Sequence, residues 1–264
     1  MWATLAFAAA LGLAPDQTGP LQLTNARATY GFLGATRPDN KLLPGDVYFV
    51  TYDIENITVK NGKALYKMSM EFLNSKGKAE FKRDPEDLES TLSLGGTRMP
   101  GMASAEVGTE TAPGEYTLKV EVTDRSTNKS ETLVRKFEVL PKAFGLVQLT
   151  LSADPQGKVP AGALGVGQSL YVNSHVVGFQ RGPAGQPNVA LELRVLDEGG
   201  KPTLASPLTG RIDKGVPPKD PVLPGEFLVS LNRPGKFTVE LKATDEVANK
   251  SVTQSFPITV HETK

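Results

Sequence analysis

Few residues in this chain have the types and spacing that catalysis or metal binding requires. Its two histidines, His175 and His261, have no partner at metal-ligand spacing, and cysteine is absent. The sequence contains no Gly-x-Ser-x-Gly elbow, P-loop or dinucleotide fingerprint. Ser126 and Lys129 have the Ser-x-x-Lys spacing of β-lactamases, but they fall in a predicted hairpin turn. We therefore predict no catalytic residue, no metal site and no cofactor, and we assign both histidines structural or solvent-exposed roles.

One dense acidic group is present, and it consists of Asp84, Glu86, Asp87 and Glu89. Glycoside hydrolysis needs two opposed carboxylates in a cleft, whereas these four follow one another on a surface segment, which favours a solvated face. A weak calcium site is the alternative, although the segment has neither the spacing nor the glycine of an EF-hand loop. The stretch 86–90 is also the one place where we expect a single helical turn.

Aromatic side chains in predicted loops are the candidates for binding. Tyr30 and Phe32 lie in a long loop rich in Gly, Pro and Asn, and Phe179 lies with Arg181 in the loop after residue 177. Tyrosine and tryptophan rings often form flat platforms for sugar rings, but the single tryptophan, Trp2, lies in the apolar N-terminal segment. Two interpretations stay open: these rings contact a ligand or partner, or they close the ends of the folded modules.

The elements that must position these loops come from a repeat. The eighteen residues from Pro113 to Ser130 return at Pro234 to Ser251, offset by 121 residues, with eight identities and no gap. Each copy opens with Pro-Gly and then alternates apolar and polar residues, which is the period of a half-buried antiparallel strand. The repeat predicts that the chain consists of two copies of one β-module.

Both copies end in Asp-x-x-x-Asn-Lys-Ser, which is a turn signature. Asp124 and Asp245 are expected to accept hydrogen bonds from backbone N–H groups two residues on, and Asn128 and Asn249 to adopt left-handed backbone geometry. We assign these four residues a structural role, with binding of an ion in the hairpin as the alternative.

The 264 residues suit two modules, which we place at 20–140 and 146–261. Short strands separated by turn signals, without helical periodicity, predict a β-sandwich for each module. The matching tetrapeptides 21–24 and 147–150 are interpreted as the two first strands, and Pro257 predicts an edge strand or a bulge. The linker 140–145 is short and contains Pro141, which favours a restricted orientation of the modules.

Gly114-Glu-Tyr-Thr-Leu118 resembles the Gly-x-Tyr-x-Cys pattern at the start of strand F in immunoglobulin domains, with Leu118 at the cysteine position. The resemblance implies that the Tyr116 hydroxyl bonds to upstream backbone as a tyrosine corner, and that Phe237 occupies the same position without a hydroxyl. The chain resembles the cysteine-free immunoglobulin-like and fibronectin-III-like tandem repeats of exported bacterial proteins. This implies an all-β fold of two tandem Ig-like antiparallel β-sandwiches, and a spacer, adhesion, assembly or accessory-domain role.

Residues 1–14 are uncharged and apolar and end in Gly-Leu-Ala, which predicts a signal peptide and an exported protein of the periplasm, cell surface or extracellular space. This segment is too short to span a bilayer. Acidic and basic residues balance at 29 each, so nucleic acid is not an expected partner.

We therefore predict a non-catalytic exported module with a structural or protein-interaction role and a protein as its partner. The alternative is a polysaccharide partner, either for a carbohydrate-binding module or for an accessory module of an extracytoplasmic enzyme.

Overall fold

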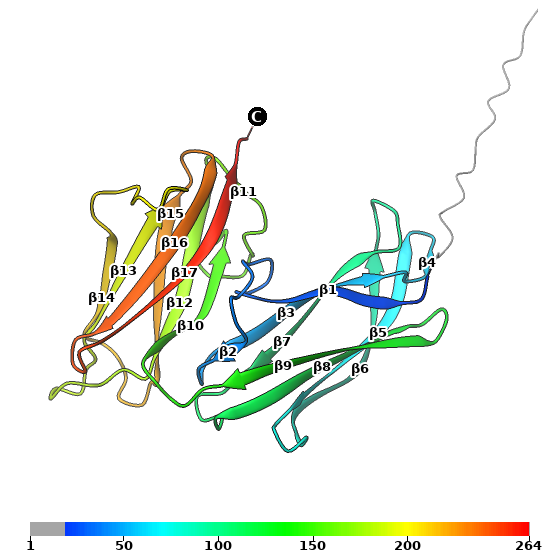
Figure 1. Ribbon diagram of the computed structural model, residues 1–264, viewed down its shortest axis with the longest axis horizontal. Coiled ribbons are helices and arrows are strands. Elements are labelled where there is room, and N and C mark those ends of the chain that lie inside the picture. Colours follow the sequence, from blue (N-terminus) through cyan, green and yellow to red (C-terminus); the bar gives the residue numbers. More distant parts are fainter. Residues whose placement is uncertain (1–18, 264) are drawn as a thin grey trace, which may run out of the picture.

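The computed structural model describes residues 19–263. Within these residues the regular secondary structure consists of β-strands, with no α-helix (Figure 1). The predicted signal peptide at 1–14 lies outside the described residues. The strands form two Ig-like β-sandwiches in tandem, so the predicted fold class is confirmed. The strands are β1 (Gln22–Thr29), β2 (Lys41–Leu42), β3 (Val47–Glu55), β4 (Val59–Lys60), β5 (Lys63–Leu73), β6 (Ala79–Thr91), β7 (Met99–Glu106), β8 (Gly114–Asp124), β9 (Lys129–Val139), β10 (Gly145–Ser152), β11 (Leu164–Gly165), β12 (Ser169–Val177), β13 (Val189–Leu196), β14 (Leu208–Ile212), β15 (Val222–Ser230), β16 (Gly235–Asp245) and β17 (Lys250–His261).

In the first sandwich the sheet β1-β3-β7 packs on a larger sheet with the order β2-β9-β8-β5-β4, in which β6 also pairs with β5. The short pair β2-β9 is parallel, and the longer strands pair antiparallel. Strand β8 carries the first copy of the repeat and lies between β9 and β5, which is the position of strand F in immunoglobulin domains.

The second sandwich repeats this order. The sheet β10-β12-β15 packs on β11-β17-β16-β13-β14, so β16 takes the position of β8. Pro257 lies on β17, which pairs with β16 from Lys250 to Val260 and with β11 only at Val260 and His261. At Pro257 the other side of β17 therefore has no partner strand within the described residues, as suits a residue without an N–H group.

A β-bulge lies at the same place in both first strands. The pairing register shifts after Thr24 in β1 and after Val147 in β10. The residues at the bulges, Asn25 and Gln148, have φ angles of 51° and 50°. Because the bulges are equivalent, Thr24 corresponds to Val147 and not to Thr150. The tetrapeptide 147–150 lies within β10 and residues 22–24 of its counterpart begin β1, but the two tetrapeptides are three residues out of register.

Residues 86–90 belong to strand β6, so the expected helical turn is wrong. Strand β6 pairs with β5 along nearly all of its length. Across this ladder the Glu89 carboxylate lies 2.6 Å from the Lys63 ammonium, and that of Asp87 lies 3.8 Å from Lys67. A single isolated helical turn is costly to nucleate, whereas the edge of β5 offers a row of backbone hydrogen bonds.

A buried contact joins the two sandwiches in addition to the linker. Tyr30, from the loop after β1, packs in the core of the second sandwich, and its ring centroid lies 6.2 Å from that of Phe256. The Arg37 guanidinium covers the Tyr30 ring and pairs with Asp46, with 3.0 Å between Nη2 and Oδ2. Asp46 Oδ1 also accepts a hydrogen bond of 2.8 Å from the backbone N–H of Gln148. The bulge of β10 is therefore part of the joint between the sandwiches.

Candidate ligand-binding cavity

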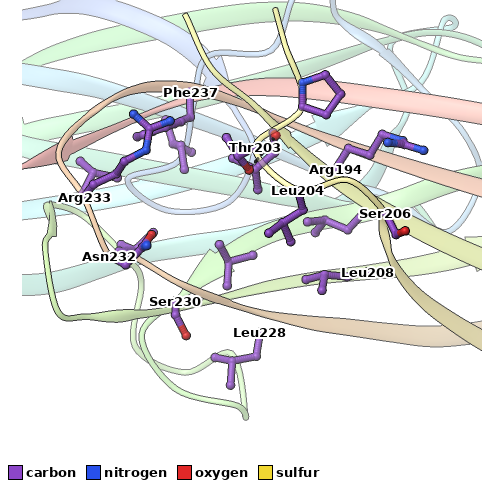
Figure 2. Close-up of a pocket in the computed structure, with 17 residues that line it drawn as sticks. Arg194, Thr203, Leu204, Ser206, Leu208, Leu228, Ser230, Asn232, Arg233 and Phe237 are labelled. Atoms are coloured by element: carbon purple, nitrogen blue, oxygen red, sulfur yellow. Dashed lines mark hydrogen bonds between the residues drawn. The ribbon is translucent and has the colours of Figure 1, made fainter.

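An apolar cavity of about 410 Å³ opens at one end of the second sandwich (Figure 2). Its floor includes Leu193 and Val195 of β13, Phe237 of β16 and Ile258 of β17. Its mouth lies between residues 202–208 and residues 228–233, which continue from β15. Sites that hold small ligands or the side chains of a partner commonly have this size and apolar character.

Aromatic rings fill the corresponding end of the first sandwich. Phe72 stacks on Tyr116 and on Phe137, with ring centroids 5.0 and 5.5 Å apart. Tyr48 stacks on the other side of this cluster, 4.4 Å from Phe137. Each of the four rings is at most 6% exposed. Stacked rings of this kind bury a large apolar area in a small space.

Three of these four rings are replaced by aliphatic side chains in the second sandwich. The replacements are Tyr48 by Leu170, Phe72 by Val195 and Phe137 by Ile258. Phe137 and Ile258 are equivalent because they pair with Tyr116 and Phe237, which occupy the same position of the repeat. Val195 and Ile258 both border the cavity. The loss of two rings at these positions accounts for the open space, since packed side chains relax only in part around missing atoms.

The mouth is open because the edge strand β14 is short. In the first sandwich β6 continues the ladder along β5, whereas β14 pairs with β13 only as far as Leu208 opposite Leu193. Pro207 precedes Leu208, and proline cannot donate a hydrogen bond to a ladder. Residues 204–207 therefore leave the sheet edge, and Leu204 is 57% exposed beside the cavity.

One cation lies at the mouth. The Arg233 guanidinium covers the Phe237 ring, 4.8 Å from its centroid (Figure 2). Within residues 19–263 no carboxylate forms an ion pair with Arg233. Arg194 also borders the cavity, but its side chain runs away from the central group of labelled residues (Figure 2). The mouth therefore carries a positive charge that no carboxylate of residues 19–263 neutralises through an ion pair.

Among the described residues, no Asp, Glu, His or Lys borders this cavity. Its polar groups are the hydroxyls of Thr203, Ser206 and Ser230, the amide of Asn232 and the arginine side chains. General acid–base catalysis needs a group that exchanges a proton near neutral pH, and arginine stays protonated. The lining of the cavity therefore offers apolar contacts, hydrogen-bonding groups and positive charge.

The loop aromatics predicted for binding lie outside this cavity. Tyr30 is 7% exposed because it packs in the core of the second sandwich, whereas Phe32 is 37% exposed. Phe179 is half-buried against the same core, with the Arg181 guanidinium over its ring at 5.4 Å from the centroid. Tyr30 thus belongs to the core of the neighbouring sandwich, and Phe32 has the largest exposed fraction of the three rings.

Backbone carbonyls hold Arg181 in place. Its guanidinium donates hydrogen bonds to the carbonyl oxygens of Gly185, Pro217 and Asp220 at 2.9, 2.8 and 2.9 Å. Arg181 and Phe179 border a second cavity of about 460 Å³, whose other wall comes from the first sandwich and the linker. The hydrogen bonds to Pro217 and Asp220 connect the loop that contains Arg181 to the segment 217–220.

The four turn residues of the repeat have the same geometry in both sandwiches. Asp124 and Asp245 each accept a hydrogen bond from the backbone N–H group two residues on, at 2.7 and 3.0 Å. Asn128 and Asn249 have φ angles of 58° and 52°. Both residues are at most 1% exposed. The second oxygen of each carboxylate accepts a hydrogen bond from a distant backbone N–H group, that of Thr58 for Asp124 at 2.9 Å and that of Gln180 for Asp245 at 2.8 Å.

The electrostatics of Asp124 follow from this geometry. Burial raises the pKa of its carboxyl group, but hydrogen bonds from Thr58 and from the backbone N–H groups of Ser126 and Thr127 outweigh burial. The pKa of Asp124 therefore lies below its ordinary value of 3.8.

A tyrosine corner is present in the first sandwich. The Tyr116 hydroxyl donates a hydrogen bond of 2.9 Å to the carbonyl oxygen of Ala112. In the second sandwich the repeat places Arg233 at the position of Ala112 and Phe237 at that of Tyr116. A contact between a cation and an aromatic ring thus replaces the corner hydrogen bond at the mouth of the cavity.

His175 lies on β12, and its Nδ1 atom is buried without a hydrogen-bond partner in the described part of the chain. Burial lowers the pKa of His175 below 6.5. His261 is exposed at the end of β17. Residues 19–263 contain no group of three or more acidic or histidine side chains placed to hold a metal ion. They also contain no helix long and apolar enough to cross a membrane.

The sequence of no single strand indicates the cavity. Its sequence signal is the comparison between the two modules, in which large rings of one copy become aliphatic residues of the other. Val195 and Ile258 are ordinary core residues when each strand is read by itself. They indicate a space only when set against Phe72 and Phe137.

No protein-family model and no curated protein sequence matches the chain. The solved structures that match include dimeric latent PorU from Porphyromonas gingivalis, with 14% identity and a TM-score of 0.38 over 94% of this chain and 21% of that one. The C-terminal domain of the Streptococcus pyogenes antigen I/II-family protein AspA matches with 8% identity and a TM-score of 0.31, over 92% of this chain and all of that domain. Red sea bream transglutaminase matches with 11% identity and a TM-score of 0.30, over 93% of this chain and 32% of the enzyme. This chain thus spans about a third of the transglutaminase and about a fifth of PorU. At TM-scores below 0.5 these likenesses say nothing about function.

Proposed function

We propose that this protein is a non-catalytic binding module, and that the apolar cavity of its second sandwich receives part of a partner. One observation carries the proposal: two sandwiches of the same topology differ in that rings fill the end of the first core, while the second core is open to solvent at that end. Among the described residues, none that titrates near neutral pH lines the open core, which supports a role in binding.

The first sandwich serves as a rigid support in this proposal. Its Tyr30 packs in the second core, and the buried pair of Arg37 and Asp46 ties the loop to β10 through Gln148. A joint with this much buried contact restricts the movement of one sandwich relative to the other. A partner bound to the second sandwich is then held at a fixed angle to the first.

We further infer that the protein acts outside the cytoplasm, from the uncharged apolar composition of residues 1–14. Fractionation of the native host tests this inference with an antibody against residues 19–263. The expected result is recovery in the envelope or culture fluid, and recovery only with cytoplasmic proteins would contradict it.

The binding proposal is tested by filling the cavity. Val195→Phe combined with Ile258→Phe restores rings at the positions that hold them in the first sandwich. Anilinonaphthalene sulfonate, which combines an apolar body with an anionic group, should bind the natural chain at one saturable site and the filled variant much more weakly. Val134→Phe is a matched control because Val134 is 49% exposed on the outer face of β9, and binding should persist there.

Circular dichroism and the melting temperature establish that all three proteins are folded. Equal binding of the probe by the natural chain and the filled variant would refute the proposed site.

A further inference from the structure

A free strand edge borders the cavity. β15 pairs with β12 and forms the outer strand of its sheet within the described residues. The chain from Leu228 to Arg233 lines the mouth, and Val229 and Leu231 contribute to its apolar wall. A segment added in extended conformation along this edge would direct alternate side chains between the two sheets.

The apolar surface continues outside the cavity. Leu204 and Leu228 lie on opposite sides of the mouth and are 57% and 50% exposed (Figure 2). Large exposed apolar side chains that flank a cavity are typical of sites that contact another macromolecule. A small ligand enclosed in the cavity would leave both leucines in water, whereas a segment lying across the mouth would cover them.

Charge at the mouth selects the kind of segment. Arg233 has no ion pair within residues 19–263, and the lining contains no carboxylate. A carboxylate of an incoming segment would find in Arg233 a partner held in place by its contact with Phe237. A lysine or arginine at the same place would meet a charge of its own sign.

These three features deepen the proposed function, on which the following inference rests. We propose that the occupant is an extended segment of a partner protein that adds to the edge of β15 and inserts apolar side chains from alternate positions into the cavity. An Asp or Glu of the segment lies at Arg233. The apolar side chains of the partner then fill the space that aromatic rings occupy in the first core.

The test uses random nine-residue segments displayed on yeast. They are selected for binding to the full chain and against binding to the Val195→Phe, Ile258→Phe variant. Enriched segments should have apolar residues at every second position and an Asp or Glu near one end. Leu204→Ser, which removes an exposed leucine from the mouth without adding core volume, serves as a second variant if the filled protein does not fold.

Synthetic versions of the enriched segments give the quantitative result. Arg233→Gln should weaken their binding about tenfold, since a charge-assisted hydrogen bond is lost. Their counterparts with Lys in place of the acidic residue should bind the natural chain more weakly than they bind Arg233→Gln, because that variant removes the repulsion between two positive charges. Amide hydrogen exchange at residues 228–230 should slow in the complex, because strand addition pairs the free edge of β15.

The outcomes separate the two proposals. Selection of no segment, segments without alternation, or a complex in which β15 exchanges as before would each overturn the strand inference. If dodecanoate binds the natural chain but not the filled variant while no segment is selected, the occupant is an aliphatic acid, and the cavity remains a binding site. If the anilinonaphthalene probe also fails to distinguish the two proteins, the proposed function falls with the inference.

Discussion

Removal of the Asp46 carboxylate should destabilise the joint between the sandwiches more than any surface ion pair does. Asp46 accepts hydrogen bonds from Arg37 Nη2 at 3.0 Å, from the Val47 N–H at 2.8 Å and from the Gln148 N–H at 2.8 Å. The side chains of Arg37 and Asp46 are 6% and 4% exposed. Asp46→Ala would therefore leave a buried guanidinium without its anion, which costs about 3–5 kcal/mol.

The same geometry predicts strong coupling between the two residues. Arg37→Met removes the charge that Asp46 compensates, so the second change should cost less in a protein that already carries the first. In a double-mutant cycle the combined loss should be smaller than the sum of the single losses by about 2 kcal/mol, within the usual range for residues in contact. Urea unfolding followed by far-ultraviolet circular dichroism measures each free energy.

The exposed pair of Lys136 and Glu115 is the matched control. Its Nζ–Oε1 distance is 2.8 Å, shorter than that of the buried pair, but its side chains are 66% and 60% exposed. Glu115→Ala should cost less than about 1 kcal/mol, and the remaining effect should fade at high salt. A loss at Asp46→Ala as small as that at Glu115→Ala, or additive losses in the cycle, would show that the joint does not depend on this pair.

Three further predictions concern single groups. Burial keeps the pKa of His175 below 6.5, so as the pH falls this histidine takes up a proton in the unfolded chain before it does so in the folded protein. The free energy of unfolding should therefore decrease below pH 6.5. His175→Asn should remove that decrease, as measured by unfolding curves at pH 7.5 and 5.5. The pKa of Asp124 in the folded protein lies below 3.8, so the stability that its carboxylate contributes is present above pH 3.8 and is lost as the pH falls through the folded pKa. Asp124→Asn should lower the free energy of unfolding by about 1–3 kcal/mol at pH 7 and reduce its dependence on pH in acid. Tyr116→Phe removes the corner hydrogen bond to Ala112 and should lower the unfolding free energy by about 0.5–1.5 kcal/mol, measured in urea; Thr117→Val, on the outer face of the same strand, is the control and should change it less.

The strands and turns could be predicted because they depend on local patterns. The alternation after Pro113 and Pro234 places residues on two faces of a strand, and the structure has β8 and β16 there. By contrast, the acidic stretch 84–89 has residues that suit a helix as well as a strand. Its state is decided by the partner β5, which lies in another part of the sequence.

The joint could not be predicted because its parts are meaningful only together. Tyr30 reads as a loop aromatic, Asp46 as a turn residue and Gln148 as part of a strand. The bulge at Gln148 turns its N–H group toward Asp46. The alternation of apolar and polar residues along a strand does not show where a single extra residue is inserted. A polar residue before a strand can have many roles, so the local sequence does not mark Asp46 as buried. Its burial depends on contacts such as that with Gln148, about a hundred positions away in the sequence.

The open core in one of the two copies of the module needs a physical explanation. Rings at these positions are compatible with the topology, because Phe72 and Phe137 pack there in the first sandwich. Aliphatic side chains at Val195 and Ile258 forfeit apolar contacts that the same backbone can make, and unfilled core space is costly. An apolar group that enters the cavity recovers those contacts, so the free energy missing from the folded chain becomes available for binding. On this argument the filled variant should melt at a higher temperature than the natural chain while it loses its partner, and a filled variant that is less stable would mean that the second sandwich has repacked around its smaller side chains.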